Sequence, residues 1–240
     1  MLCKIADLYV EISEAGGLSS RLESYAVKEK PAVDFTPDIT IREDIYKLER
    51  WSGLSYENSV YMESGELFYV KLIKRGGMML HSSAVELDGR AYLFSGPSGM
   101  GKSTHARLWK SLFENAKVLN DDKPALREVD GVWYAYGTPW CGKDGININM
   151  KAEIAGICFL KRGDKNAIRR IPKIEAVSAI LSQTIANFAI SEPIHALMGV
   201  IERLVDKIPI YELICKAEPE AAELSYETMS KGAPNNENQG

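Results

Sequence analysis

The amino-acid sequence predicts an α/β protein with a mixed β-sheet, a β-rich N-terminal part and a helical C-terminal part. Three observations lead to this fold class. Short apolar and aromatic segments joined by Asp-Gly turns occupy much of residues 83–136. A helix with an apolar stripe is predicted inside this region at 103–113. After residue 173, apolar residues follow helical spacing over most of the chain.

Composition and charge narrow the classes of protein. The chain has 240 residues, 45% of them hydrophobic, and is long enough to bury a substantial core. Its 29 basic and 33 acidic residues give a net charge of −4, so no global electrostatic attraction draws it to nucleic acid or anionic lipid. It has neither an apolar run of about 18 residues nor a signal-peptide pattern at its start. We therefore expect a cytoplasmic protein without a nucleic-acid or membrane partner.

The cysteines and histidines predict neither a disulfide framework nor a zinc centre. The four cysteines, Cys3, Cys141, Cys158 and Cys215, lie far apart without a C-x-x-C spacing. They are predicted to be reduced and mostly buried. Because the chain has only three histidines, a zinc site would require distant residues to converge.

Three regions are predicted along the chain. Residues 1–75 are expected to form a β-rich lobe packed on the core, with a strand at Leu8–Ile12 and a hairpin in which Val60–Glu63 and Leu67–Leu72 flank Ser64-Gly65. Residues 76–232 are expected to form the core, and the polar residues 233–240 a disordered tail. The core is expected to contain strands at Ser83–Leu87, Arg90–Ser95, Lys117–Asn120, Ala125–Val129, Val132–Tyr136, Ile154–Leu160 and Ile210–Cys215, and helices at Ser103–Phe113, Ile174–Phe188, Pro193–Val205 and Pro219–Met229.

A glycine-rich segment between a predicted strand and a predicted helix carries the strongest chemical signal. Gly96-Pro97-Ser98-Gly99-Met100-Gly101-Lys102-Ser103 fits the P-loop pattern G-x-x-x-x-G-K-[ST]. Its glycines allow backbone N–H groups to surround phosphates, and the following helix presents its positive N-terminus to the same anion. Lys102 is expected to reach the β- and γ-phosphates, and the Ser103 hydroxyl to join the Mg²⁺ shell. These residues and Thr104 are the predicted nucleotide-binding segment.

Two adjacent acids, Asp121-Asp122, follow the apolar strand at 117–120. In P-loop proteins, an acid at such a strand end holds Mg²⁺. Neighbouring side chains point in different directions from an extended backbone, so one carboxylate is expected at the metal and the other at the attacking group. A solvated turn is the alternative interpretation, because aspartate pairs are common in loops.

Two further features are candidates for the site. His81 begins the hairpin that leads into the P-loop, so its strand is expected beside the P-loop strand, where an imidazole can contact a phosphate or orient a water. A structural or surface histidine is the alternative interpretation. His105, on the predicted helix, is expected to be a structural or surface histidine. The segment Tyr136–Gly145 contains three glycines and a proline; in it, Lys143 and Trp140 either face a substrate or belong to a plain surface loop.

The order of these features resembles HPr kinase/phosphorylase, a bacterial enzyme that phosphorylates a protein serine and shares its fold with ATP-dependent phosphoenolpyruvate carboxykinase. The similarity rests on His81, which lies 15 residues before Gly96, on the form G-x-S-G-x-G-K-S of the P-loop, and on the strand-terminal pair Asp121-Asp122. The chain resembles more closely the HPr-kinase-like proteins of bacterial peptide-modification systems, some of which phosphorylate serines of precursor peptides.

The resemblance implies a fold, cofactors and residue roles. The core is then a P-loop nucleotide-binding core of the HPr kinase and carboxykinase type. ATP and Mg²⁺ are the implied cofactors, and a homo-oligomer is an assembly that the resemblance allows. Asp121 is the implied base toward the acceptor hydroxyl, Asp122 joins Ser103 as a metal ligand, and His81 lies near the transferred phosphate.

Three functions fit these residues. The first is an ATP-dependent kinase acting on a serine hydroxyl of a small protein or peptide, since phosphoryl transfer requires mainly positioning and charge neutralisation. The second is a kinase for free serine or a similar small alcohol. The third is a non-catalytic protein in which ATP controls partner binding by residues 1–75. The joint presence of Lys102, Ser103 and both aspartates favours catalysis over the third function.

Overall fold

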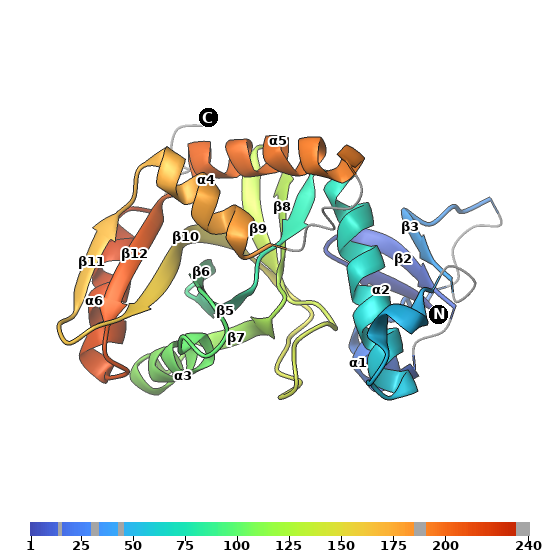
Figure 1. Cartoon of the computed structure of the whole chain (residues 1–240), viewed down its shortest axis with the longest axis horizontal. Coiled ribbons are helices and arrows are strands. Elements are labelled where there is room, and N and C mark those ends of the chain that lie inside the picture. The colour runs from blue at the N-terminus through green and yellow to red at the C-terminus, as the bar shows by residue number, and fades with distance from the viewer. Residues whose placement is uncertain (14–15, 30–33, 43–45, 185–190, 234–240) are drawn as a thin grey trace.

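Two β-sheets and the helices packed on them make up the described part of the chain, which comprises residues 1–13, 16–29, 34–42, 46–184 and 191–233 of a computed structural model (Figure 1). The arrangement is a mixed α/β fold, as the sequence predicts. The disorder predicted for residues 234–240 and the end of the helix predicted at Ile174–Phe188 lie outside the described residues. No helix within the described ranges is long and apolar enough to cross a membrane.

The smaller sheet lies in the N-terminal part of the chain. Its described strands are β1 (Leu2–Ile5), β2 (Leu8–Ile12) and β3 (Ile39–Ile41). β2 pairs antiparallel with β1 and in parallel with β3. Apolar side chains of these strands share one core cluster with helix α2 (Tyr56–Ile73). Short helical turns accompany them at Gly16–Leu18, Ser19–Leu22 (α1), Glu23–Tyr25 and Leu48–Trp51.

The hairpin predicted at residues 60–72 is wrong, because this segment lies within the 18-residue helix α2. Val60, Phe68 and Leu72 recur at helical spacing and are buried. Ser64-Gly65 makes no turn and lies on the buried side of the helix, where a Cβ on Gly65 would come within 2.9 Å of the Trp140 ring. The small residue is needed for close packing, and a Ser-Gly pair is equally common in turns, which explains the error.

The larger sheet has nine described strands, and its longest strand, β10 (Lys151–Arg162), pairs with three others. β10 runs parallel to β6 along one side; along its other side it pairs first with β9, antiparallel, and then with β12, in parallel. The order is β4-β8-β9-β10-β6-β5-β7, with β12 beside β10 and β11 beside β12. The other strands are β4 (Gly77–Met79), β5 (Ser82–Leu87), β6 (Arg90–Ser95), β7 (Lys117–Asp122), β8 (Ala125–Val129), β9 (Val132–Tyr136), β11 (Ala167–Arg170) and β12 (Ile210–Cys215).

Both predicted Asp-Gly hairpins of the core are confirmed. β5 and β6 pair antiparallel around Asp88-Gly89, whose φ angles of 52° and 80° are those of a tight primed turn. β8 and β9 pair in the same way around Asp130-Gly131. The buried strand predicted at Ile154–Leu160 lies within β10 and is buried along its whole length.

Helices pack on both faces of the larger sheet (Figure 1). On one face, α3 (Lys102–Leu112) and α6 (Pro219–Lys231) pack together around Trp109, whose ring contacts Tyr92 and Tyr226. On the other face, α4 (Lys173–Ser182) and α5 (Ser191–Lys207) cover a largely aliphatic core that also contains Trp133 and Phe159. These helices match the predicted ones where the chain is described, with α4 ending at Ser182.

The segment after β9 turns back against β7 through a close backbone approach at Gly137. The Gly137 N–H donates to the Met150 carbonyl at 3.0 Å, and the Ile148 N–H donates to the Leu119 carbonyl at 2.9 Å. A Cβ at position 137 would overlap the carbonyl oxygen of Ile148 and lie 2.7 Å from that of Leu119. The segment therefore reaches the end of β7 only with glycine at this position.

Gly137→Ala is expected to lower the free energy of unfolding by about 1–3 kcal/mol, the usual cost of overpacking a closed site. For a chain of this length, that loss corresponds to a fall in Tm of roughly 2–12 °C, measured by thermal denaturation. Gly199→Ala is the matched control, because position 199 lies within α5 with ordinary space around its Cβ and alanine favours a helix. An unchanged Tm in Gly137→Ala would contradict the close approach.

Candidate functional site

Three strands begin or end at one edge of the larger sheet. β5 lies between β6 and β7 and runs antiparallel to both, so its first residue, Ser82, pairs with Ser95 at the end of β6 and with Asp122 at the end of β7. His81 precedes Ser82, and Gly96 follows Ser95. The strand that follows His81 therefore lies beside the one that leads into the glycine loop (residues 96–101), as the sequence predicts. The register brings the imidazole, the loop and the aspartates together.

The glycine loop connects β6 to α3, in the strand and helix context predicted from the sequence. Gly99 and Gly101 have φ angles of +76° and +105°, which residues with side chains rarely adopt. Gly101 is the N-cap of α3 and provides no side-chain cap, so the first N–H groups of the helix are left for another acceptor. An anion is the group that such a helix terminus stabilises.

Lys102 turns its ammonium group back into the loop. Its Nζ donates to the carbonyl oxygens of Gly96 at 2.8 Å and Pro97 at 3.3 Å, and the residue is only 8% exposed. Burial lowers the pKa of Lys102, although the charges of Asp122 and Asp121 oppose this shift. The buried ammonium and the uncapped helix N–H groups can donate to a polyphosphate. The two neighbouring carboxylates can bind the divalent cation that accompanies it.

Asp121 and Asp122 have different partners at the end of β7. The Ser83 hydroxyl donates to Oδ1 of Asp121 from the paired position on β5. Nε2 of His81 lies 3.1 Å from Oδ1 of Asp122, and the Lys123 ammonium pairs with Oδ2. Burial by itself would raise the pKa of Asp122, but the His81 hydrogen bond and the Lys123 charge outweigh it and hold the pKa below its ordinary value. Asp122 is therefore ionised at neutral pH.

These groups line one cavity of about 470 Å³. Its lining consists of the predicted site residues His81, Ser98, Gly99, Gly101, Lys102, Ser103, Thr104, Asp121 and Asp122 and of Gly142, Lys143 and Asp144. Gly96, Pro97 and Met100 line a second cavity, on the α4 side of the loop. Among the described residues, no three His, Cys, Asp or Glu side chains form a metal-binding group. Mg²⁺ often uses one or two carboxylates together with substrate phosphates and water, so Asp122 and Ser103 fit its requirements.

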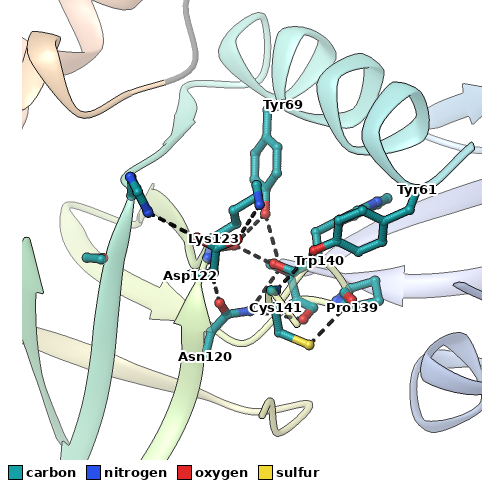
Figure 2. Close-up of polar contacts among 12 residues, drawn as sticks. Tyr61, Tyr69, Asn120, Asp122, Lys123, Pro139, Trp140 and Cys141 are labelled. Carbon is teal, nitrogen blue, oxygen red and sulfur yellow. Dashed lines mark hydrogen bonds and ion pairs between the residues drawn. The ribbon is translucent and has the colours of Figure 1, made fainter. Parts of the chain in front are cut away.

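The loop after β9 is held by a polar network in which the Thr138 hydroxyl donates to the Lys123 carbonyl. Figure 2 shows Lys123 with Tyr69 and Asn120 of this network around it. The Asn120 side chain donates to the Thr138 carbonyl at 3.0 Å and accepts from the Lys123 N–H at 2.7 Å. The Tyr69 hydroxyl donates to the Lys123 carbonyl and lies 3.0 Å from the Thr138 hydroxyl. Helix α2 thereby fixes the residue that directly follows the aspartate pair.

Of the two loop residues considered as substrate contacts, one is excluded by its burial. Trp140 is 0% exposed, stacks on Phe68 with ring centroids 4.7 Å apart, and donates from Nε1 to Ser64 Oγ at 3.2 Å. It anchors the loop on α2 and faces no substrate. Lys143 is exposed and lines the cavity beside the aspartates.

Three residues of the site were missed by reasoning from the sequence. Ser83 and Lys123 contact the aspartates, and their closeness in sequence to His81 and Asp122 is a signal that would have found them. Tyr61 has no such signal. Its hydroxyl accepts from the Gly142 N–H at 3.0 Å, and a Cβ on Gly142 would lie 3.1 Å from Cβ of Asp122. The hydrogen bond to Tyr61 therefore helps to hold Gly142 in contact with Asp122.

Of the structural and surface roles expected for His105, the structure shows the first, because the residue lies in the core and is 3% exposed. Its Nε2 lies 3.0 Å from Oγ of Ser225, which accepts from Trp109 Nε1 at 2.9 Å and donates to the Ala222 carbonyl at 2.8 Å. Since the single hydroxyl proton is directed to Ala222, Nε2 of His105 is the donor. Burial lowers the pKa of His105 to about 4, so its ring is neutral at neutral pH.

Comparison with known proteins places the chain in a family. The sequence profile of the family described as "SynChlorMet cassette protein ScmC" matches residues 58–220, more than half of the 240 residues. The chain belongs to the ScmC family. The ScmC match begins in α2 and extends past β12, so it includes the glycine loop and the aspartate pair.

This ScmC family member was also compared with curated proteins and with solved structures. A search of the curated proteins finds no match. Among solved structures, the chain is similar to "Structure of the Hpr(Ser) kinase/phosphatase from Coxiella burnetii", with 11% sequence identity and a TM-score of 0.34 over 64% of this chain and 93% of that chain.

In this ScmC family member, His105 is expected to make folding stability depend on pH below neutrality. Its pKa is lowered from 6.5 to about 4 on folding. The unfolded chain therefore gains the proton first as the pH falls, and stability is lost between these values. Between pH 7 and pH 5 the loss from this residue is about 2 kcal/mol, measured by urea unfolding.

His105→Gln is expected to remove this part of the pH dependence. His195→Gln is the matched control, because the side chain of His195 is exposed on α5. If His105→Gln lost as much stability on acidification as the native chain, a neutral, buried His105 would be excluded.

Proposed function

We propose that the chain is an ATP-dependent phosphotransferase that moves the γ-phosphate of Mg-ATP to a serine hydroxyl of a small protein or peptide. The observation that carries this proposal is the convergence of the glycine loop, Lys102, Ser103 and both aspartates in one cavity. Phosphoryl transfer requires groups of these kinds: backbone donors, a cation, metal ligands and a base. The cavity volume of about 470 Å³ lies in the usual range for small-molecule sites.

The glycine loop and the N-terminus of α3 bind the phosphates in this proposal. Lys102 exchanges the carbonyl oxygens of Gly96 and Pro97 for phosphate oxygens, which are stronger, charged acceptors. Ser103 and Asp122 hold Mg²⁺, which neutralises charge on the phosphates. Because the Lys123 ammonium pairs with Asp122, metal binding there competes with this cation.

Asp121 accepts the proton of the acceptor hydroxyl as the new oxygen–phosphorus bond forms. The Ser83 hydrogen bond holds Oδ1 and sets the direction of the carboxylate. Within the described part of the chain, Oδ2 of Asp121 has no hydrogen-bond donor, so it is free to act on a substrate. His81, held by Asp122, lies close to the transferred phosphate in this proposal.

The proposal extends to the organisation and location of the protein. Residues 76–232 act as a P-loop core of the HPr kinase and carboxykinase type, residues 1–75 act as a lobe packed on it, and the enzyme works in the cytoplasm. The similarity of His81, the G-x-S-G-x-G-K-S segment and Asp121-Asp122 to HPr kinase/phosphorylase supports this part. The closer similarity to HPr-kinase-like proteins of peptide-modification systems supports a peptide acceptor.

Phosphoryl transfer from Mg-ATP to a pool of serine-containing peptides and to free serine, followed by mass spectrometry, tests the proposal. A phosphopeptide would support a peptide kinase. Phosphoserine alone would instead assign a kinase for a small alcohol. Retained ATP binding in a calorimetric titration, without transfer to any acceptor, would refute catalysis in favour of an ATP-dependent switch.

Asp121→Asn is expected to bind ATP with nearly native affinity and to reduce transfer by about 10²–10⁴-fold, because an amide does not accept the hydroxyl proton. Lys102→Ala is expected to weaken ATP binding itself, because it removes a charged phosphate donor. Asp88→Asn is the matched control, since asparagine tolerates the positive φ of the β5–β6 turn. Native turnover in Asp121→Asn would exclude Asp121 as the base.

A further inference from the structure

A groove leads from Asp122 toward the N-terminal part of the chain. Its volume is about 490 Å³, and it shares Asp122, Gly142 and Lys143 with the cavity at the glycine loop. We call it the N-terminal groove. Its remaining lining residues come from the α1 and α2 regions and from the end of β7: Gly17, Arg21, Leu54, Glu57, Asn58, Tyr61, Met62 and Lys123.

The neighbouring cavities lead in other directions. One of about 550 Å³ shares Gly99, Gly101 and Thr104 with the central cavity and continues along the ends of β10 and β12. The cavity on the α4 side contacts Gly96 and Pro97 but neither aspartate. Unlike these two cavities, the N-terminal groove is lined by Asp122, which directly follows Asp121 in the chain. The groove therefore offers space beyond Asp122 for an acceptor whose hydroxyl stands at Asp121, on the side away from the cavities along the glycine loop.

The charge of the N-terminal groove is positive, although the whole chain carries −4. Its basic residues are Arg21, Lys123 and Lys143, and its acids are Glu57 and Asp122. Lys123 pairs with Asp122, which leaves two cations against Glu57. Within the described residues, Lys143 forms no ion pair, so its ammonium is available to an incoming carboxylate.

The wall on the side of α2 combines cations with apolar surface. The Arg21 guanidinium lies 5.4 Å and the Lys123 ammonium 5.6 Å from the ring centroid of Tyr61, so both cations are held close to this ring. Leu54, which is 48% exposed, and Met62 add apolar surface further along. Such a lining suits a peptide segment that carries both acidic and apolar side chains.

We infer that the N-terminal groove binds the phosphate acceptor, and that this acceptor is a peptide with acidic side chains close to the serine that is modified. An extended peptide advances about 3.3 Å per residue, so an acid within a few residues of a serine at Asp121 reaches the region of Lys143 and Arg21. The inference rests on the proposed function for the reaction, but the charge preference of the groove is measurable without turnover.

Binding of short fluorescein-labelled peptides to the full chain tests the inference. The peptides carry a central serine flanked by Asp, Asn or Lys, and fluorescence anisotropy is read with Mg²⁺ and a non-hydrolysable ATP analogue present. The Asp peptide is expected to bind on the order of tenfold more tightly than the Lys peptide at low ionic strength. The difference is expected to shrink as salt is added, because solvent-exposed charges are screened.

Lys143→Glu is the decisive variant, because Lys143 is exposed and without an ion pair among the described residues. It is expected to abolish or reverse the preference for the Asp peptide. Arg21→Gln is expected to weaken Asp-peptide binding in the same direction; it is the second variant because Arg21 also donates to Sγ of Cys141. Lys110→Glu, exposed on α3 and lining none of these cavities, changes the net charge equally and is expected to bind like the native chain.

The outcomes separate this inference from the proposed function. Charge-selective binding that Lys143→Glu removes, with no transfer from ATP to any peptide, would support the groove and refute the phosphotransferase. Transfer without a charge preference would support the phosphotransferase and overturn the groove. Absence of binding by all three peptides, or equal behaviour of Lys143→Glu and Lys110→Glu, would also overturn the groove.

Discussion

The antiparallel register of β5 between β6 and β7 is the constraint on which the candidate site depends. It places Ser82 opposite both Ser95 and Asp122, so the chain leaves β6 for the glycine loop next to the place where β7 ends in carboxylates. A shift by one residue would turn every side chain of β5 to the other face of the sheet and separate Ser83 from Asp121. The buried side chains of β5, which pack on both faces, oppose such a shift.

Charge balance is the second condition for this arrangement. Two carboxylates stand at one sheet edge, and Lys102, Lys123 and His81 lie around them. The His81 hydrogen bond and the Lys123 charge hold the pKa of Asp122 below its ordinary value despite burial, and the aspartates oppose the burial that lowers the pKa of Lys102. In the structure, therefore, Asp122 binds a protein cation where we propose that it binds a metal ion, and Lys102 binds carbonyl oxygens where we propose that it binds phosphates.

The N-terminal part of the chain contributes to the site itself. Helix α2 holds the segment after the aspartates through Tyr69 and the glycine at position 142 through Tyr61. The same helix packs on Trp140, which ties the loop to the smaller sheet and its core cluster. Disruption of α2 would thus change the position of Lys123 and Gly142, although α2 lies about fifty residues or more before them in the sequence.

The sequence by itself determined the α/β class, the core hairpins, the buried strand β10, and the candidate residues His81, Lys102, Ser103, Asp121 and Asp122 of the site. These features are local: an Asp-Gly turn, an apolar run or a glycine motif is written in neighbouring residues. Only the tertiary structure decided that residues 60–72 are helical, that Trp140 is buried and that Tyr61 supports the site. Each of these features depends on contacts between distant segments. Gly65 packs closely on the Trp140 ring, so the Ser-Gly pair belongs to a helix rather than to a turn. Trp140 in turn stacks on Phe68 of the same helix, so this loop residue belongs to the core.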